Sequence, residues 1–266
     1  MLKPKPNLWP RAVILSLIIA PVALLALFTT SGAKEPQAVN ATADLWIDML
    51  IGPPLVPLFN QEACDDDIAR VGHPSQVGQL SGITSGRKLV VFKSIAEAEE
   101  YLPNMADKID IAGYNLEGGQ GSPTPPEELA DPVGSIQKMR VLADTYGLDL
   151  ALGPDHNFAL SHGAAMVPYV NYFILQIQRQ QTNPPVVHEF ITTLVPQLRA
   201  ANPDLQISAQ VRTEGDVQAI VALLDSLESY LDGVSILTSP DTVDVAEELL
   251  FFLRAKRTYL PQIIGE

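Results

Sequence analysis

"LDLALGPDHNFALSHGAAMVPYVNYFILQIQ" (148–178) contains two short apolar runs separated by a segment of a different kind. The runs at 148–155 and 170–178 have the length and composition of buried strands, and residues 157–166 between them are typical of a helix. A strand, a helix and a second strand in this order form the unit from which parallel sheets are built. This stretch therefore predicts an α/β fold.

The same alternation runs through most of the chain. Further strands are predicted at 88–94, 108–117, 205–212 and 232–239, each followed by a helical pattern. Asp131 and Pro132 mark a helix start, and Gly147 marks its end. The segment 45–86 has weaker signals, with a first strand near 45–52 and room for another. We predict a (β/α)8 barrel of the TIM type with an irregular N-terminal part, the alternative being an open doubly wound sheet.

The N-terminal residues have the features of an export signal. Residues 1–33 combine basic residues with an apolar run and end on Ser-Gly-Ala, so they predict a signal peptide or an uncleaved membrane anchor. Residues 34–44 are read as a linker, and 45–266 as a single barrel domain. The expected location is therefore secreted or extracytoplasmic, and an uncleaved N-terminal segment is the only contact with a membrane that the sequence predicts.

The composition of the chain limits the classes of ligand and partner that can be expected. The chain has 31 acidic and 17 basic residues, a formal charge of −14, which disfavours nucleic acid as a partner. Cys64 is the single cysteine, so no disulfide within the chain is expected. The four histidines are scattered, and no H-E-x-x-H motif occurs, so neither a metal site nor a cofactor is predicted. A carbohydrate or another neutral polar ligand is the expected partner.

Polar side chains collect where the predicted strands end. In a barrel of this type, chemistry takes place at the carboxyl ends of the strands. Amide groups there can pair with ligand hydroxyl or amide groups, and a nearby aromatic ring could stack on a sugar. The candidate catalytic residues are Glu117 and Asp155. The candidate substrate-binding residues are Tyr114, Asn115, His156, Gln176, Gln178, Gln210 and Arg212.

The strand that ends at Glu117 resembles a known family. Residues 110–117, Asp-Ile-Ala-Gly-Tyr-Asn-Leu-Glu, are similar to the D-x-x-D-x-D-x-E motif of the chitinase-like glycoside hydrolase family 18 barrels. This chain keeps the first Asp and the Glu, whereas Gly113 and Asn115 stand where that family has acids. The resemblance covers roughly residues 88–255 and implies a sugar-binding barrel with Glu117 as the general acid.

Three functions remain open at this point. The first is an exported glycoside hydrolase that acts on a polysaccharide, with Asp155 as a second carboxylate in a two-acid mechanism. The second is a carbohydrate- or cell-wall-binding barrel without catalytic activity, because Asn115 cannot supply the charge that the family's mechanism needs. The third is a different barrel enzyme or a scaffold.

Overall fold

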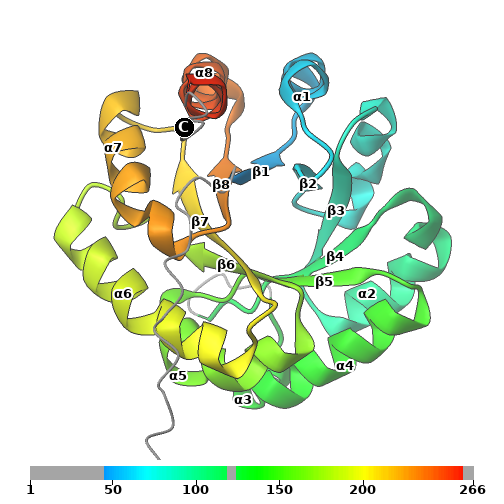
Figure 1. The fold of residues 1–266 in the computed structure, drawn as a ribbon. Coiled ribbons are helices and arrows are strands. Elements are labelled where there is room, and N and C mark those ends of the chain that lie inside the picture. Colours follow the sequence, from blue (N-terminus) through cyan, green and yellow to red (C-terminus); the bar gives the residue numbers. More distant parts are fainter. Residues whose placement is uncertain (1–44, 119–123, 260–266) are drawn as a thin grey trace, which may run out of the picture. The chain divides into compact units, whose positions relative to one another are not determined.

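The computed structural model describes residues 45–118 and 124–259, and the side chains of these residues up to 255. Eight strands in this part of the chain form a closed parallel barrel in sequence order, with β8 pairing with β1 (Figure 1). The strands are β1 Trp46–Leu50, β2 Ile68–Val71, β3 Arg87–Phe92, β4 Ile111–Tyr114, β5 Asp149–Leu152, β6 Tyr172–Gln176, β7 Gln206–Arg212 and β8 Gly233–Leu237. The predicted (β/α)8 barrel is confirmed.

Helices lie around the outside of the barrel and connect successive strands (Figure 1). The α-helices of the described residues are α1 Val56–Glu62, α2 Ile95–Tyr101, α3 Pro126–Ala130, α4 Pro132–Thr145, α5 His156–Met166, α6 Pro184–Ala201, α7 Val217–Leu227 and α8 Val243–Tyr259. Short 3-10 helices supplement them, of which η2 Pro74–Gly82 connects β2 to β3 and η7 Pro240–Thr242 precedes α8. The predicted start of α4 is correct, because Asp131 Oδ1 accepts the Gly134 N–H at 3.0 Å.

The weak N-terminal stretch holds β1 and β2, as the sequence allowed. The predicted signal or anchor segment, residues 1–33, and the predicted linker, residues 34–44, lie outside the described residues. Within the described part, no helix is both long and apolar enough to cross a bilayer.

Two apolar cores fill the fold. The larger one lies between the barrel and its helices, and it includes the outward-facing residues of every strand. The smaller one fills the barrel interior with Trp46, Ile68, Leu89, Val91, Ile111, Ala151 and Ile174. Because side chains alternate along a strand, these interior residues fix which of the later positions on each strand face inward.

Four side chains tie the strands together at the N-terminal end of the barrel. An Asp or Asn precedes each even-numbered strand, and its side chain accepts the backbone N–H of the second residue of the preceding odd-numbered strand. The pairs are Asp67 with Ile47 (2.7 Å), Asp110 with Lys88 (2.8 Å), Asn171 with Leu150 (2.9 Å) and Asp232 with Ile207 (2.7 Å). We call these the N-terminal clamps.

Arginines from the helices reinforce three of the four clamps. In each case the helix is the one that precedes the odd-numbered strand around the closed barrel. The contacts are Arg254 of α8 with Asp67, Arg140 of α4 with Asn171 (2.8 Å) and Arg199 of α6 with Asp232 (2.9 Å). The clamps thus repeat every two strands around this end of the barrel.

A layer of large side chains closes the same end from inside. The Trp46 indole N–H donates to Gln206 Oε1 at 3.2 Å, and its ring lies edge-on to Tyr172 with 5.6 Å between centroids. A Cβ on Gly233 would lie 2.3 Å from the Trp46 ring, so glycine is required beside it. This end of the barrel is therefore packed with side chains that bind each other.

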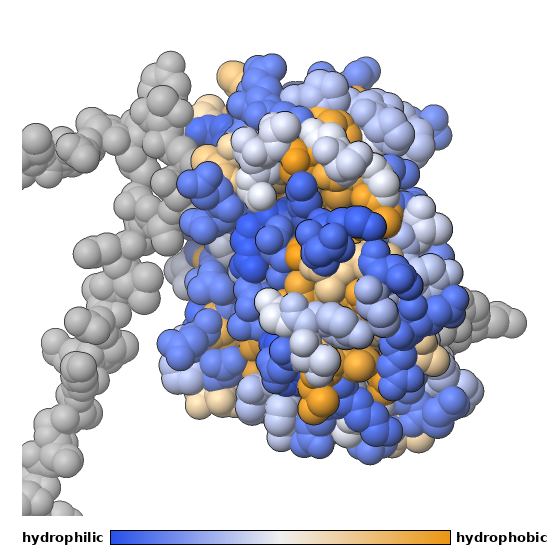
Figure 2. All heavy atoms as spheres, turned by 90° about the vertical axis from the view of Figure 1, so that its right-hand side faces the viewer, coloured by the Kyte–Doolittle hydropathy of each residue, from blue (hydrophilic) through white to orange (hydrophobic). Residues whose placement is uncertain are grey.

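The surface of the barrel is polar on the side seen in Figure 2. Figure 2 shows one side of the barrel as mostly hydrophilic, with smaller hydrophobic areas between the polar ones. Among the described residues, the large apolar side chains with the greatest exposure are Val141, Leu160, Val186 and Phe251.

Candidate functional site

The C-terminal ends of β4 and β6 direct amide side chains into the barrel mouth. Ile111 on β4 and Ile174 on β6 belong to the interior core. Asn115 and Gln176 have the same phase as these residues, and so they face inward nearer the mouth. The alternate residues that were selected from the sequence at the ends of these two strands therefore face the inside of the barrel.

A hydrogen-bonded cluster forms around Glu117, two residues beyond Asn115. Gln176 Nε2 donates to Glu117 Oε1 at 3.0 Å, and Asn115 Nδ2 lies 3.4 Å from the same oxygen. Gln176 Nε2 also donates to the Gly153 carbonyl at 2.9 Å, and Gln178 Nε2 donates to Gln176 Oε1 at 3.1 Å. The structure thus brings together four of the predicted site residues: Asn115, Glu117, Gln176 and Gln178.

Thr124 holds the backbone of this cluster. The Glu117 N–H donates to Thr124 Oγ1 at 3.2 Å, and the Thr124 hydroxyl donates to the Asn115 carbonyl at 3.0 Å. The sequence "TPPE" at 124–127 is typical of a helix cap, but Pro125 is the residue that precedes α3, and no side chain caps it. Thr124 instead fixes the end of the strand that carries Glu117.

A pocket of about 460 Å³ lies beside this cluster and is called the Gln178 pocket below. The residues that line it include Gly118, Asp155, His156, Phe158, Gln176 and Gln178. Glu117 adjoins it through its bond to Gln176 and as the neighbour of Gly118 in the chain.

Two residues that line this pocket each carry a buried polar atom without a partner among the described residues. Gln178 Oε1 and His156 Nδ1 are both buried, and neither makes a hydrogen bond there. His156 is held in place by its ring, which stacks on Phe190 with 4.1 Å between centroids. Buried polar atoms are nearly always paired in native proteins, so these two require a partner from outside the described chain.

Asp155 has a structural role that the sequence prediction missed. Its Oδ1 accepts the backbone N–H groups of Asn157 (3.1 Å) and Phe158 (3.2 Å), and so it caps α5. Its Oδ2 accepts the Gly118 N–H at 3.0 Å. Both oxygens accept from backbone donors, and Asp155 therefore positions the pocket wall.

Tyr114 lies outside the mouth, contrary to its predicted role in substrate binding. It is fully buried in the layer between barrel and helices, since it has the opposite phase to Gly113 and Asn115. Its hydroxyl donates to Glu128 Oε2 at 2.6 Å. Burial, together with this bond and the negative charge of Glu128, raises the pKa of Tyr114 well above its usual value.

Gln210 belongs to a second buried cluster on the other side of the barrel interior. Arg70 Nε donates to both oxygens of Asp48 (2.8 and 2.9 Å), and Arg70 Nη2 donates to Ser235 Oγ at 3.1 Å. Ser235 Oγ donates to Asp48 Oδ2 at 2.7 Å and lies 3.5 Å from Gln210 Oε1. Sequence reasoning missed Asp48 and Arg70, although single charges inside the apolar runs "WIDML" and "IARV" were a signal for a buried ion pair.

Arg212 is the last residue of β7 and lies two residues after Gln210, so it is on the same inward-facing side of the strand. Gln181 fixes its backbone, because the Arg212 N–H donates to Gln181 Oε1 at 2.8 Å and Gln181 Nε2 donates to the Arg212 carbonyl at 3.1 Å. Its guanidinium makes no hydrogen bond or ion pair with the described residues, and it does not line the Gln178 pocket. The structure therefore does not join Arg212 to the cluster around Glu117.

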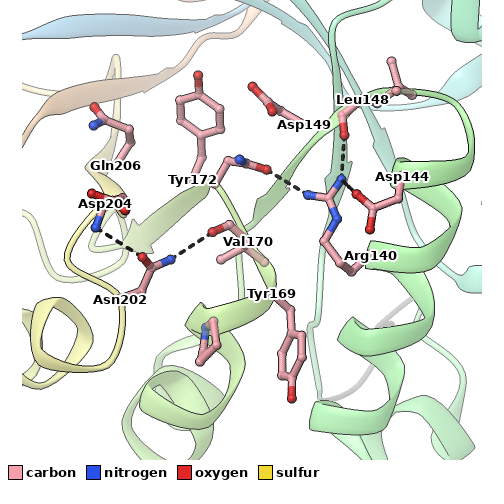
Figure 3. A pocket seen from close by; sticks show the side chains of 13 residues that line it. Arg140, Asp144, Leu148, Asp149, Tyr169, Val170, Tyr172, Asn202, Asp204 and Gln206 are labelled. Atoms are coloured by element: carbon pink, nitrogen blue, oxygen red, sulfur yellow. Dashed lines mark hydrogen bonds and ion pairs between the residues drawn. The ribbon is translucent and has the colours of Figure 1, made fainter.

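A larger pocket of about 580 Å³ lies at the opposite, N-terminal end of the barrel (Figure 3). Arg140 projects into it and is held by Asp144 (2.7 Å) and the Leu148 carbonyl (2.7 Å), and Asn202 donates to the Val170 carbonyl at 3.3 Å (Figure 3). Its polar groups are thus largely bonded to one another and to the clamps. In barrels of this type the N-terminal end serves stability, so we place the functional site at the mouth.

No group of three or more His, Cys, Asp or Glu side chains in residues 45–118 and 124–255 is arranged so that it could hold a metal ion. Cys64 is exposed and not in a disulfide.

Comparisons with known proteins identify the fold. No family model matches the sequence, and no curated protein matches it. Among solved structures, phosphonopyruvate hydrolase in complex with oxalate and Mg++ is similar with a TM-score of 0.52 and 9% identity, covering 82% of this chain and 87% of that one. A phosphonomutase-like protein from Burkholderia cenocepacia has a TM-score of 0.51 and 11% identity, covering 81% and 94%.

A decarboxylase of 3-keto-L-gulonate-6-phosphate from Vibrio cholerae is similar to the same degree. Its TM-score is 0.51 at 12% identity, and the match covers 83% of this chain and 100% of that one. At such low identity the likeness shows a shared barrel fold, and function resides in sites that differ between proteins of one fold.

The resemblance to family 18 glycoside hydrolases is wrong. The structural neighbours are barrels of other classes, and no family model supports that relationship. The motif also fails physically. A Cβ on Gly113 would lie 2.8 Å from Leu89 Cδ2, so this position has no room for an acid without a shift in the core. Asp110 accepts the Lys88 N–H in a clamp at the far end of the barrel.

The predicted function falls with the resemblance. The prediction of a glycoside hydrolase acting on a polysaccharide is therefore wrong. The carbohydrate-binding alternative loses the support of the motif and rests only on the amide and aromatic side chains near the strand ends. The similar barrels belong to other enzymes, and Asp155 caps a helix.

Proposed function

We propose that the barrel mouth binds a small, neutral polar molecule in the Gln178 pocket, with Glu117 as the group that accepts a proton or a hydrogen bond from it. The single observation that carries this proposal is the pair of buried atoms without a partner, Gln178 Oε1 and His156 Nδ1. A ligand that donates to Gln178 and pairs with His156 removes the cost of leaving both atoms buried and unbonded.

The surroundings of Glu117 support a role as acceptor. A carboxylate accepts hydrogen bonds, and amide N–H groups can only donate them. Glu117 Oε1 receives Gln176 Nε2 at 3.0 Å, with Asn115 Nδ2 at 3.4 Å, which is the arrangement that suits an ionised carboxylate.

The arrangement is also built to hold its geometry. Gln176 is anchored to the Gly153 carbonyl, Asp155 caps α5 and holds Gly118, and Phe190 supports the His156 ring. Side chains fixed in this way lose little freedom when a ligand binds, which favours affinity.

The test is a ligand-observed NMR screen of the full-length protein against neutral polyols, simple amides and amino alcohols. For each compound that binds, the affinity is measured again with Gln178→Leu and Glu117→Gln. The proposal expects Gln178→Leu to weaken binding about tenfold, the value of one good hydrogen bond.

Gln197→Leu is the matched control, since Gln197 is an exposed glutamine on α6 whose amide donates to the Thr193 carbonyl. If Gln178→Leu and Gln197→Leu bind every compound with equal affinity, the Gln178 pocket is not the site. If binding depends on Gln178 but not on Glu117, the pocket stands and the proton-accepting role is removed.

A further inference from the structure

A second pocket opens at the barrel mouth, away from the Gln178 pocket. It has a volume of about 480 Å³ and lies where β1, β2 and β8 end. The residues that line it are mainly apolar and include Leu50, Ile51, Leu55, Gly72, Pro240 and Val243. None of its lining residues lines the Gln178 pocket, so the two are separate sites on one end of the barrel. We call it the Gln79 pocket.

Most polar groups of the Gln79 pocket already have partners within the chain. His73 contacts Glu97 at 3.0 Å and Ser75 at 2.8 Å. Thr238 Oγ1 donates to the Leu50 carbonyl at 2.7 Å. Ser239 forms a capping box with Thr242 at the start of η7. The chain has therefore satisfied these groups without a ligand.

Gln79 has a buried polar atom that the chain has not satisfied. Its Oε1 is buried and makes no hydrogen bond with any residue that the structure describes. Gln79 lies on η2, whose residues Pro74 and Leu80 are buried, so its backbone is anchored by the core. A buried acceptor in a mostly apolar cavity is costly unless a donor meets it.

We propose that the Gln79 pocket binds a small, mainly apolar molecule that carries one N–H or O–H donor, which Gln79 Oε1 accepts. A cavity of several hundred Å³ with apolar walls and few polar groups is the usual form of a small-molecule site. Its place at the carboxyl ends of three barrel strands is where such sites occur in this fold. This proposal is independent of the one for the Gln178 pocket, because it rests on different residues.

Gly72 allows the pocket to be closed by a single substitution. A Cβ at this position would have its nearest neighbours at 3.8 Å, Gln76 Oε1 and Leu50 Cδ1, so a side chain fits without a clash at its base. A valine there reduces the free volume of the pocket. Gly78, on the same 3-10 helix as Gln79, has nothing within 4 Å of its Cβ position and is exposed, so Gly78→Val is the matched control.

The experiment uses two probes of the same two-ring shape, indole and benzothiophene, of which only indole has an N–H donor. Their binding to the full-length protein is measured by NMR titration of the leucine and valine methyl groups. We expect indole to shift the methyl signals of Leu50, Leu55 and Val243, and to bind about tenfold more tightly than benzothiophene.

Three variants separate the contribution of the cavity to binding from that of the Gln79 acceptor. Gly72→Val is expected to weaken both probes at least tenfold, and Gly78→Val to change neither. Gln79→Met keeps the shape of the side chain and removes the acceptor, so it is expected to bring indole to the affinity of benzothiophene. The proposal is overturned if indole leaves these methyl signals unmoved, if Gly72→Val binds indole like the natural protein, or if the two probes bind the natural protein equally.

Discussion

The two ends of the barrel differ in how their buried polar atoms are paired. At the N-terminal end, each clamp side chain accepts a backbone N–H, and arginines reinforce three of the four. At the mouth, Gln178 Oε1, His156 Nδ1 and Gln79 Oε1 are buried without a partner in the described residues. The accepting oxygens of the clamps thus have partners within the chain, although Arg140 Nε at that end is also buried without one in the described residues, whereas the mouth has three such atoms.

This difference follows from what each end has to do. A bonded polar group fixes the register of a strand and stabilises the fold, and leaving it unbonded costs about 1–3 kcal/mol. At the mouth, three buried atoms remain unbonded in the described residues, and this loss of stability is consistent with a binding site for a ligand. Substitutions at the N-terminal end should therefore change stability, and those at the mouth should change binding with little effect on stability.

The largest expected loss of stability is at the Asp67 clamp. Asp67 is fully buried and receives the Ile47 and Cys64 N–H groups (2.7 and 2.6 Å) and the guanidinium of Arg254. Asp67→Ala removes the acceptor of these three contacts and is expected to lower the free energy of unfolding by about 3–5 kcal/mol, measured by urea unfolding.

Asp65→Ala is the control for that change. Asp65 lies in the same turn but is exposed, so its substitution is expected to change the free energy of unfolding by less than about 0.5 kcal/mol. Equal losses for the two variants would show that the clamp does not stabilise the barrel.

A smaller loss is expected where Tyr114 meets Glu128. Tyr114→Phe removes the donor at 2.6 Å from Glu128 Oε2 inside the packed layer, which should cost about 2 kcal/mol at pH 7. Urea unfolding measures it, and Tyr146→Phe, at the end of α4, is the control.

Tyr114 also makes the stability of the protein depend on pH in the alkaline range. Burial, with the bond to Glu128 and its charge, raises the pKa of Tyr114 in the folded state, whereas in the unfolded chain it titrates near about 10. The contribution of Tyr114 to the free energy of unfolding is complete below about pH 10. It is lost as pH rises above that value, by up to ~1.4 kcal/mol per pH unit. Unfolding midpoints between pH 8 and 11 should fall less steeply in Tyr114→Phe, and identical slopes would contradict the assignment.

The fold was predictable because its signals are local. Each strand from 88 onward is a short apolar run followed by a helical pattern, and that order determines a parallel barrel. The cluster of Asn115, Glu117, Gln176 and Gln178 was also within reach, since the carboxyl ends of barrel strands meet at one mouth and side chains alternate along a strand.

Other features depend on pairing between distant segments, which the sequence shows only weakly. The Asp48–Arg70 ion pair joins β1 and β2, both in the stretch with the poorest pattern. The clamps join residues about 20 positions apart through a backbone N–H, which carries no sequence signal of its own. The structural roles of Asp155 and Tyr114 were missed for local reasons: Asp155 directly precedes a helix that needs a cap, and Tyr114 has the outward phase of its strand.

The individual clamps should also differ in their contribution to the free energy of unfolding, by about 1 kcal/mol. Asp232 accepts the Ile207 N–H and pairs with Arg199 at 2.9 Å, whereas Asp110 is exposed, accepts the Lys88 N–H and forms no ion pair within 4 Å among the described residues. Asp232→Ala is therefore expected to lower the urea midpoint more than Asp110→Ala, because it removes the acceptor of a guanidinium as well as that of a backbone N–H. If the order is reversed, the arginines do not reinforce the clamps.

The smallest expected effect on stability lies at the mouth, and its sign is opposite. His156→Phe keeps a ring against Phe190 and removes the buried Nδ1 that has no partner in the described chain. Because an unbonded buried nitrogen is unfavourable, this variant is expected to be as stable as the natural protein or more stable by about 0.5–1 kcal/mol. His162→Phe, on the same helix, is the control, since no nitrogen of His162 is among the buried atoms without a partner. A loss of more than about 1 kcal/mol in His156→Phe alone would mean that Nδ1 is satisfied in the free protein, and the contrast between the two ends of the barrel would then not extend to His156.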